Sequence, residues 1–268
     1  RRIVGVGGGG GAEIAGLAAA WRDLTDSTFE AGSGSEEGRQ RTQVDDGISV
    51  TAVDIADWSG VVQRLDASIR CADVRASAGA GSGVCRPPLV HDLAGNEFKV
   101  RFRRANVLDL SEVELGELFR TTNIHHSESN KSQPEPEPES ESTVLVTLMF
   151  TLNELFATSM AKATGFLLRM TDSLQPGAIL LVVDSPGSYS TLKLGKGNGE
   201  EKQERRYPMK FLLDHTLLSV AQGKWDRVFS QDSRWWRRDA ARLQYDVGEG
   251  AGLEDMRFQI HIYRRVGS

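Results

Sequence analysis

The sequence predicts an α/β fold: a doubly wound, mostly parallel sheet of seven strands, with helices on both faces and a C-terminal antiparallel hairpin. Two observations predict this class. Apolar runs typical of buried strands alternate with helix-type apolar spacings along most of the chain. The last two strand patterns then follow one another with no helical pattern between them. A length of 268 residues suits one domain, residues 1–268, that carries insertions.

Each expected element has a local signal. The strands are short apolar or alternating segments at residues 3–6, 49–54, 98–102, 142–150, 178–184, 224–230 and 256–266. The helices are predicted at residues 12–21, 58–71, 111 onward, 155–170 and 208–222. Ser111 and Glu114 form a capping-box pattern at the start of the third of these helices.

Low-complexity segments interrupt the pattern. Residues 30–47 and 128–142 are acidic and poor in apolar side chains, so we expect disordered surface insertions there. Residues 193–206 are polar and glycine-rich, which predicts either a mobile loop over the active-site edge or a plain solvated connection.

Composition excludes several classes of protein. No run approaches 18 apolar residues, so no membrane span is expected. Cys71 and Cys85 form no CxxC motif and are typical of packing or surface cysteines in a reducing compartment. The five histidines show no ligand spacing with them, so no metal site is expected. Because the chain starts at Arg1 without a methionine, we expect further residues before it.

The charge is uneven along the chain, although the formal net charge is −5. Residues 1–200 carry 19 basic and 27 acidic side chains, whereas residues 201–268 carry 13 basic and 10 acidic ones. An anionic partner is therefore compatible with the acidic composition.

A glycine-rich loop follows the first strand. Gly5, Gly7 and Gly10 satisfy G-x-G-x-x-G, a pattern whose missing side chains let the backbone approach a ligand at a helix N-terminus. No Lys-Ser/Thr pair follows, which excludes a Walker P-loop. Asp54, at the end of the second strand, can accept both hydroxyls of a ribose. These features fit a nicotinamide dinucleotide and S-adenosylmethionine equally.

Later motifs favour S-adenosylmethionine. The segment "SLQPGAILLVVDSP" resembles the turn and strand L-x-P-G-G-x-L of the Rossmann-like S-adenosylmethionine-dependent methyltransferases. The segment "ANVLD" resembles their adenine-edge motif, which implies that Asp109 accepts a hydrogen bond from the exocyclic amine. These methyltransferases often have an acidic residue where Ile3 stands here, so the methionine amino group needs another partner, either a backbone carbonyl or Glu13. The expected cofactor-binding residues are Gly5, Gly7, Gly9, Glu13, Asp54, Asn106, Val107, Asp109 and Thr151.

A narrower resemblance covers nearly the whole chain apart from the two acidic insertions. The segments "VGVGGGGGAE", "FTLNELF", "VVDSPGSYS", "DSRWWRR" and "LEDMRF…YRR" occur in an order that resembles the fungal 25S ribosomal RNA uridine-N3 methyltransferases. This resemblance implies a nuclear or nucleolar enzyme that acts on large-subunit ribosomal RNA. A monomer is expected. Alternatives are a methyltransferase for a small molecule or a protein, and a non-catalytic binding module on the same fold.

Three residues are candidates for the chemistry. Methylation at N3 of uridine requires removal of a proton, and therefore a base near the acceptor. Related methyltransferases place acceptor contacts after the fourth strand, which implies that Asn153 binds the uracil edge and that Glu154 is the base. Asp184 is a second base candidate. The alternative roles are helix capping for the Thr151–Glu154 segment and an Asx-type turn for Asp184.

The sixth strand is followed by an aromatic and basic segment. Flat rings beside cations suit irregular or single-stranded RNA. Alternatively, one tryptophan packs in the core and the arginines pair with acids. The expected RNA contacts are Arg234, Trp235, Trp236, Arg237 and Arg238.

Overall fold

The predicted sheet is confirmed. The structure, a computed structural model, describes residues 1–30, 47–71, 74–75, 85–86, 88–90, 97–119, 142–187, 189–194, 203–237 and 255–267. Its main sheet has seven strands in the order β10-β11-β7-β6-β1-β2-β5. These strands are β1 (Arg2–Val6), β2 (Ile48–Asp54), β5 (Phe98–Arg104), β6 (Thr143–Met149), β7 (Ile179–Asp184), β10 (Trp225–Trp236) and β11 (Met256–Arg265). The five strands from β7 to β5 pair in parallel, while β11 runs antiparallel to both β7 and β10.

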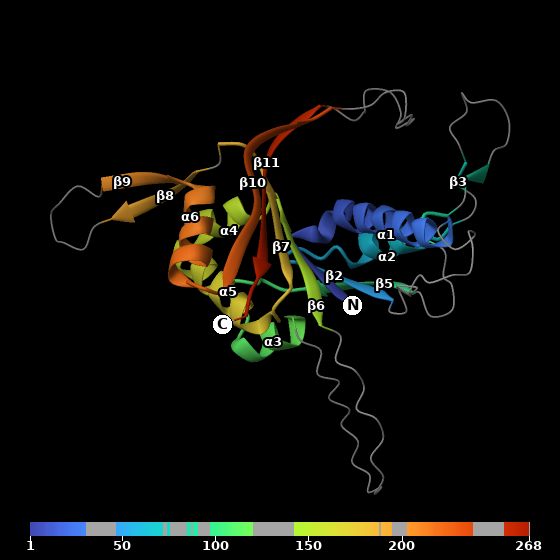
Figure 1. The fold of residues 1–268 in the computed structure, drawn as a ribbon, viewed down its shortest axis with the longest axis horizontal. Coiled ribbons are helices and arrows are strands. Elements are labelled where there is room, and N and C mark those ends of the chain that lie inside the picture. The colour runs from blue at the N-terminus through green and yellow to red at the C-terminus, as the bar shows by residue number, and fades with distance from the viewer. Residues whose placement is uncertain are drawn as a thin grey trace, which may run out of the picture.

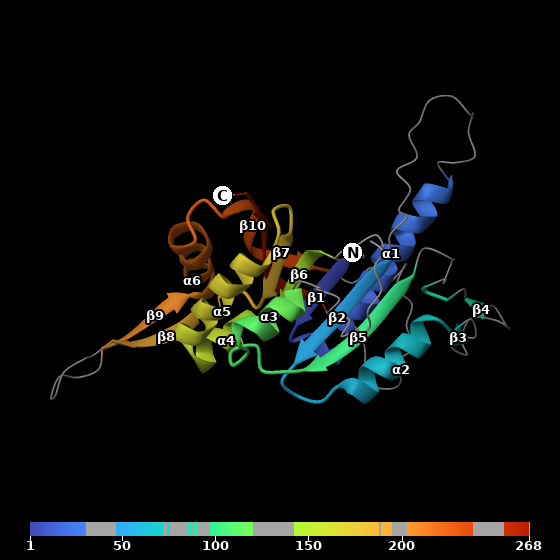
Figure 2. The same cartoon turned by 90° about the horizontal axis from the view of Figure 1, so that it is seen from below.

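Helices cover both faces of the sheet (Figures 1 and 2). The helices are α1 (Ala12–Glu30), α2 (Ser59–Ile69), α3 (Glu112–Phe119), α4 (Leu152–Thr158), α5 (Met160–Ser173) and α6 (Met209–Asp214), which continues into a π-helical segment, η2 (His215–Val220). The alternation of side chains along β1 explains the two layers, because Val4 and Val6 pack on the α3–α6 side while Ile3 packs on the α1–α2 side. Strand β1 is buried along its whole length, as expected for a central parallel strand.

The structure corrects several sequence-based boundaries. The helix predicted over 155–170 is two helices, because Ser159 has an extended backbone and its side chain accepts a hydrogen bond from the Lys162 backbone N–H as the N-cap of α5. Strand β10 runs to Trp236, so residues 231–236 of the aromatic and basic segment, which was expected to follow the sixth strand, are part of it. Ser111 and Glu114 do form the capping box, with the Ser111 backbone N–H donating to the Glu114 carboxylate at 2.8 Å.

Two short antiparallel ribbons were not predicted. One pairs β3 (Val74–Arg75) with β4 (Cys85–Arg86). The other pairs β8 (Tyr189–Leu194) with β9 (Gln203–Pro208) and projects from the body of the protein (Figure 1). Residues 193–194 and 203–206 of the predicted mobile loop are therefore strand. Hydrogen bonds between the two strands stabilise this polar segment, and its sequence has no apolar pattern that would predict a strand. The tip of that loop, residues 31–46 and residues 120–141 lie outside the described residues.

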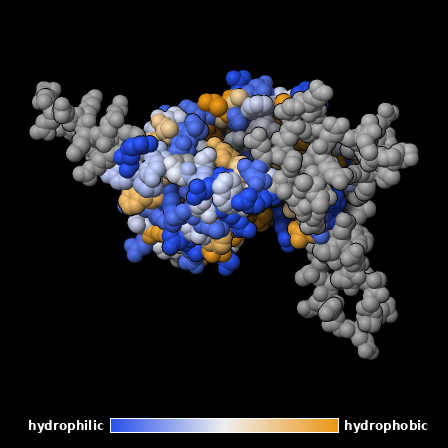
Figure 3. Space-filling model, turned by 90° about the horizontal axis from the view of Figure 1, so that it is seen from above, coloured by the Kyte–Doolittle hydropathy of each residue, from blue (hydrophilic) through white to orange (hydrophobic). Residues whose placement is uncertain are grey.

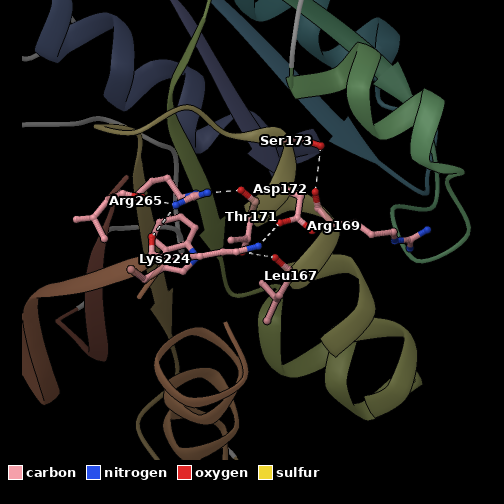
Figure 4. A network of polar contacts seen from close by, with 9 residues as sticks. Leu167, Arg169, Thr171, Asp172, Ser173, Lys224 and Arg265 are labelled. Carbon is pink, nitrogen blue, oxygen red and sulfur yellow. Dashed lines mark hydrogen bonds and ion pairs between the residues drawn. The ribbon is translucent and has the colours of Figure 1, made fainter. Parts of the chain in front are cut away.

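A polar network ties the C-terminal hairpin to α5 (Figure 4). Arg265 is 8% exposed, and its guanidinium donates to the carbonyl oxygens of Thr171 at 3.0 Å and of Lys224 at 3.1 Å. The Thr171 hydroxyl in turn accepts a hydrogen bond from the indole of Trp225 at 2.9 Å. One buried cation therefore supplies donors to carbonyl groups of two separate elements.

Replacing this cation should destabilise the fold. Arg265→Leu leaves the buried Thr171 carbonyl without its donor, whereas the Lys224 carbonyl keeps the Val266 backbone N–H at 3.0 Å. We expect the free energy of unfolding to fall by about 1–3 kcal/mol. Arg264→Leu is the matched control, because the preceding side chain is exposed on the same strand and should change stability by less than about 0.5 kcal/mol. Urea denaturation followed by circular dichroism measures both, and equal effects would contradict the role given to this network.

Candidate cofactor and acceptor site

A cavity opens at the carboxyl ends of the parallel strands. Its volume is about 290 Å³, near the lower end of the range for small-molecule sites. The walls come from the ends of β1, β2, β5 and β6 and from α4. Of the residues predicted for cofactor and acceptor binding, six line it: Gly7, Asp54, Asn106, Val107, Thr151 and Glu154.

The glycine loop is held tightly beneath this cavity. Gly7 has φ +79°, and a Cβ on it would lie 2.0 Å from the Thr151 hydroxyl oxygen. A Cβ on Gly9 would lie 2.1 Å from the ring of Trp58. Gly11 has φ +86° and faces Leu65 in the same way, whereas a Cβ on Gly10 would meet nothing within 4 Å. The structure therefore requires glycine at positions 7, 9 and 11, rather than at the third position of the predicted motif.

Asp54 joins the glycine loop to the cavity. Its carboxylate accepts hydrogen bonds from the backbone N–H of Gly9 at 3.3 Å and of Ala56 at 3.0 Å. A carboxylate has about four lone-pair directions, so this one retains capacity for the hydroxyls of a sugar. The prediction for Asp54 is consistent with this geometry.

Six of the predicted cofactor and acceptor residues do not line the cavity: Gly5, Gly9, Glu13, Asp109, Asn153 and Asp184. Gly5 is buried in β1 beside Thr147. Asn153 donates its backbone N–H to Asp184 at 3.1 Å, and Asp184 is only 3% exposed. Ser185 also donates its backbone N–H to Asp184 at 2.8 Å. This geometry favours the turn-fixing role of Asp184 over the base role, because its carboxylate ties the end of β7 to the first turn of α4.

Asp109 also differs from the expectation. Its carboxylate forms an ion pair with Lys162 on α5 at 2.6 Å and accepts a hydrogen bond from the Asn106 side chain at 2.6 Å. The Lys162 ammonium holds the pKa of the Asp109 carboxyl below its usual value. Asp109 does not line the cavity; it closes the turn that presents Asn106, Val107 and Leu108 to it. Sequence spacing could not reveal a partner more than 50 positions away.

Glu13 lies in the first turn of α1, under the glycine loop. Its carboxylate lies 3.5 Å from the point where a Cβ on Gly8 would stand. Burial raises the pKa of the Glu13 carboxyl above its ordinary value, and the negative charge of Asp54 raises it further. A ligand cation near both carboxylates would offset this repulsion.

Phe150 was not predicted as a site residue, although the structure places it in the cavity lining. It is the residue between β6 and Thr151, and it is 43% exposed. Its φ is +55°, and no other non-glycine residue in the described ranges has a positive φ. A bulky side chain in this backbone region costs about 1–2 kcal/mol. No pattern in the sequence predicts a left-handed backbone at this phenylalanine.

The segment predicted to bind RNA lies at the far end of the terminal hairpin. In the register, Gln259 of β11 pairs with Asp184 at the end of β7, so Arg234, Trp235 and Trp236 extend past the carboxyl edge of the parallel sheet. Trp235 is 53% exposed, and the Arg237 guanidinium lies 5.3 Å from its ring centre while pairing with Asp255. Arg238 lies outside the described residues. Figure 3 shows the face seen from the hairpin tip, where hydrophilic side chains predominate and hydrophobic ones are scattered.

Sequence comparison identifies the family. Residues 1–264 match the model of a family of SAM-dependent methyltransferases. The chain belongs to this methyltransferase family.

Individual proteins also show similarity to this chain. The yeast (Saccharomyces cerevisiae) protein named 25S rRNA (uridine(2843)-N(3))-methyltransferase is 27% identical over 263 residues, which are 96% of this chain and 59% of the yeast protein. The methyltransferase thus spans about three fifths of the length of that relative. A SAM-dependent methyltransferase from Methanosarcina mazei is 12% identical, with coverage of 100% and 93% of the two chains and a TM-score of 0.46. The 16S rRNA (adenine(1408)-N(1))-methyltransferase from Catenulisporales acidiphilia is also 12% identical, with coverage of 100% and 88% and a TM-score of 0.42.

The residues of the methyltransferase fit its cofactor, S-adenosylmethionine. The Asp54 carboxylate suits ribose hydroxyls, and Ile55, Val107 and Leu108 provide apolar walls for a planar adenine. When bound, the cofactor supplies an electrophilic methyl group on a sulfonium. No helix in the described part of the chain is both long and apolar enough to cross a membrane. Among the same residues, no three or more His, Cys, Asp or Glu side chains group as metal ligands.

Proposed function

We propose that this methyltransferase transfers the methyl group to N3 of a uridine in large-subunit ribosomal RNA. The observation that carries the proposal is the 27% identity to the yeast 25S rRNA uridine-N3 enzyme along 96% of the chain. A nuclear or nucleolar location and a monomeric state are part of the same proposal.

The acceptor side of the cavity supports this chemistry. Glu154 lines the cavity from the first turn of α4, and Thr151, which was predicted as a cofactor contact, lines it from the β6–α4 connection. Strands β2 and β5, on the other side of β1, form the walls assigned to the cofactor. We assign Glu154 as the base, because it is exposed at the cavity and a carboxylate there can take the N3 proton as the methyl group arrives. Asp184 positions the first turn of α4, through its bond to the Asn153 backbone, and thereby positions Glu154. Asn153 is kept as the candidate for the uracil edge.

The terminal hairpin is the proposed RNA contact. Arg234 and Trp235 are exposed beyond the sheet edge, and Arg237 is exposed beside them. Trp235 offers a stacking surface, and the arginines offer charge for phosphates.

Neutralising this segment should weaken RNA binding and change its salt dependence. In the triple variant Arg234→Gln, Arg237→Gln and Arg238→Gln, we expect the slope of log affinity against log salt to become shallower by about 2, since each single-strand phosphate contact contributes about 0.7. Fluorescence anisotropy with labelled RNA at several salt concentrations measures the slope. Lys99→Gln with Arg101→Gln, two exposed cations on β5 at the opposite edge of the sheet, is the control. An unchanged slope in the triple variant would remove the hairpin as the RNA contact.

The reaction itself is tested with radioactive cofactor. The protein is incubated with tritiated S-adenosylmethionine and 25S rRNA from a yeast strain that lacks its own uridine-2843 enzyme, and the RNA is digested to nucleosides. We expect the label in 3-methyluridine. Label in another nucleoside, or in protein or small molecules only, would reject the proposed acceptor, and failure to bind the cofactor would indicate a non-catalytic module.

A further inference from the structure

The backbone of Phe150 is fixed from both sides. Its N–H donates to the Val183 carbonyl of the neighbouring strand at 2.7 Å. The hydroxyl of the next residue, Thr151, donates to the carbonyl of the preceding residue, Met149, at 2.9 Å, which closes a tight turn around it. The Thr151 side chain is also pressed against Gly7 of the glycine loop. These contacts hold the left-handed backbone in place.

Two features of Phe150 are unfavourable for stability alone. Glycine or asparagine would adopt this φ with less strain, and a phenylalanine residue is normally buried, whereas Phe150 is 43% exposed. The strain and the exposure occur at one residue, and that residue faces the cavity. Strained residues of this kind cluster at sites that hold ligands.

The position of the ring identifies what it would contact. The cofactor's proposed sugar and adenine walls come from β2 and β5, whereas Phe150 directly follows β6, which lies on the other side of β1. Glu154, the proposed base, lines the cavity from the first turn of α4, four residues further along the chain. The ring of Phe150 therefore lies on the acceptor side of the cavity. There the planar uracil has to be held with one edge toward Glu154, the proposed proton acceptor.

We propose that Phe150 is the stacking platform for the target pyrimidine, holding the ring of an unpaired or extruded uridine in the cavity. This inference rests on the proposed function. Stacking on an aromatic face is tolerant of base identity, so Phe150 positions the acceptor while the edge contacts select it. The left-handed backbone of Phe150 directs its ring into the cavity. The alternation of side chains along β6 would not by itself hold the ring in that position.

Two substitutions at this position test the proposal. Phe150→Gly removes the ring and relieves the strain, so its melting temperature should not fall, while Phe150→Trp keeps an aromatic face. We expect Phe150→Gly to lower kcat/KM for 25S rRNA by about ten- to a hundredfold, and Phe150→Trp to retain most of the activity. Affinity for S-adenosylhomocysteine, measured by calorimetry, should stay within about threefold in both variants. Phe211→Ala removes another exposed ring, on α6 and outside the cavity lining, and should change neither value.

A spectroscopic probe separates stacking from a structural role. A short oligouridylate that contains one 5-fluorouridine is bound to the complex with S-adenosylhomocysteine, and its fluorine resonance should move upfield with the wild-type protein and with Phe150→Trp but not with Phe150→Gly. An equal shift in the glycine variant, no binding of the oligouridylate, or a parallel loss of S-adenosylhomocysteine affinity would overturn the proposal. If the wild-type protein transfers no methyl group to ribosomal uridine, the proposed function fails, and the fluorine shift still decides whether Phe150 stacks on a pyrimidine.

Discussion

Glu154→Gln is expected to lower the rate of methyl transfer to RNA by about 10²–10⁴-fold, the usual contribution of a positioned base. The substitution keeps the size of the side chain and its place in the first turn of α4, but the amide cannot accept the N3 proton. Because Glu154 lines the cavity on the side away from Asp54, affinity for S-adenosylmethionine should change by less than about threefold. Single-turnover transfer from tritiated cofactor measures the rate, and calorimetry measures the affinity.

A second glutamate provides the control for this substitution. Glu112 is exposed in the first turn of α3, and Glu112→Gln should leave the rate of methyl transfer unchanged. A Glu154→Gln rate within tenfold of the wild-type rate would remove Glu154 as the base.

Gly7→Ala is expected to abolish cofactor binding at micromolar concentrations and to destabilise the protein. The added Cβ would lie 2.0 Å from the Thr151 hydroxyl oxygen, and the backbone has φ +79°, so both the strand end and the turn before α4 must move. Overpacking costs about 1–3 kcal/mol, and the left-handed backbone adds about 1–2 kcal/mol. Thermal unfolding and calorimetry with S-adenosylhomocysteine measure the two effects.

Gly10→Ala is the matched control in the same loop. A Cβ there has open space around it, and Gly10 has no positive φ. Its melting temperature should stay close to that of the wild-type protein, and its cofactor affinity within about threefold. If Gly10→Ala is as damaging as Gly7→Ala, the third glycine of the motif contacts the cofactor in a way that the steric argument omits.

The strands of the main sheet could be predicted because parallel strands buried on both faces need continuous apolar residues. β6 and β7 show this signal clearly. The break between α4 and α5 was missed because apolar spacing continues across it, although Ser159 is a good N-cap residue. The β8–β9 ribbon was missed because its strands are largely polar.

The lining of the cavity was predictable where it depends on the residues at or soon after the end of a strand, and unpredictable where it depends on contacts with distant parts of the chain. Gly7 follows β1, Asp54 ends β2 and Glu154 lies in the first turn of the helix after β6, and all three line the cavity. The ion pair between Asp109 and Lys162 requires α5 to pack against the turn between β5 and α3. The spacing of residues along the chain does not reveal this packing. The exposed ring of Phe150 depends on a backbone angle that bonds to β7 impose.

Titration of S-adenosylhomocysteine into the wild-type protein and Asp54→Ala most directly tests whether this cavity is the cofactor site. One binding site is expected, and the variant should bind about 10- to 100-fold more weakly, because hydrogen bonds to a charged acceptor contribute about 1.5–3 kcal/mol. Asp57→Ala, three residues further on and outside the cavity lining, should bind as the wild-type protein does. No heat of binding to the wild-type protein, or equal affinity in Asp54→Ala, would contradict the assignment.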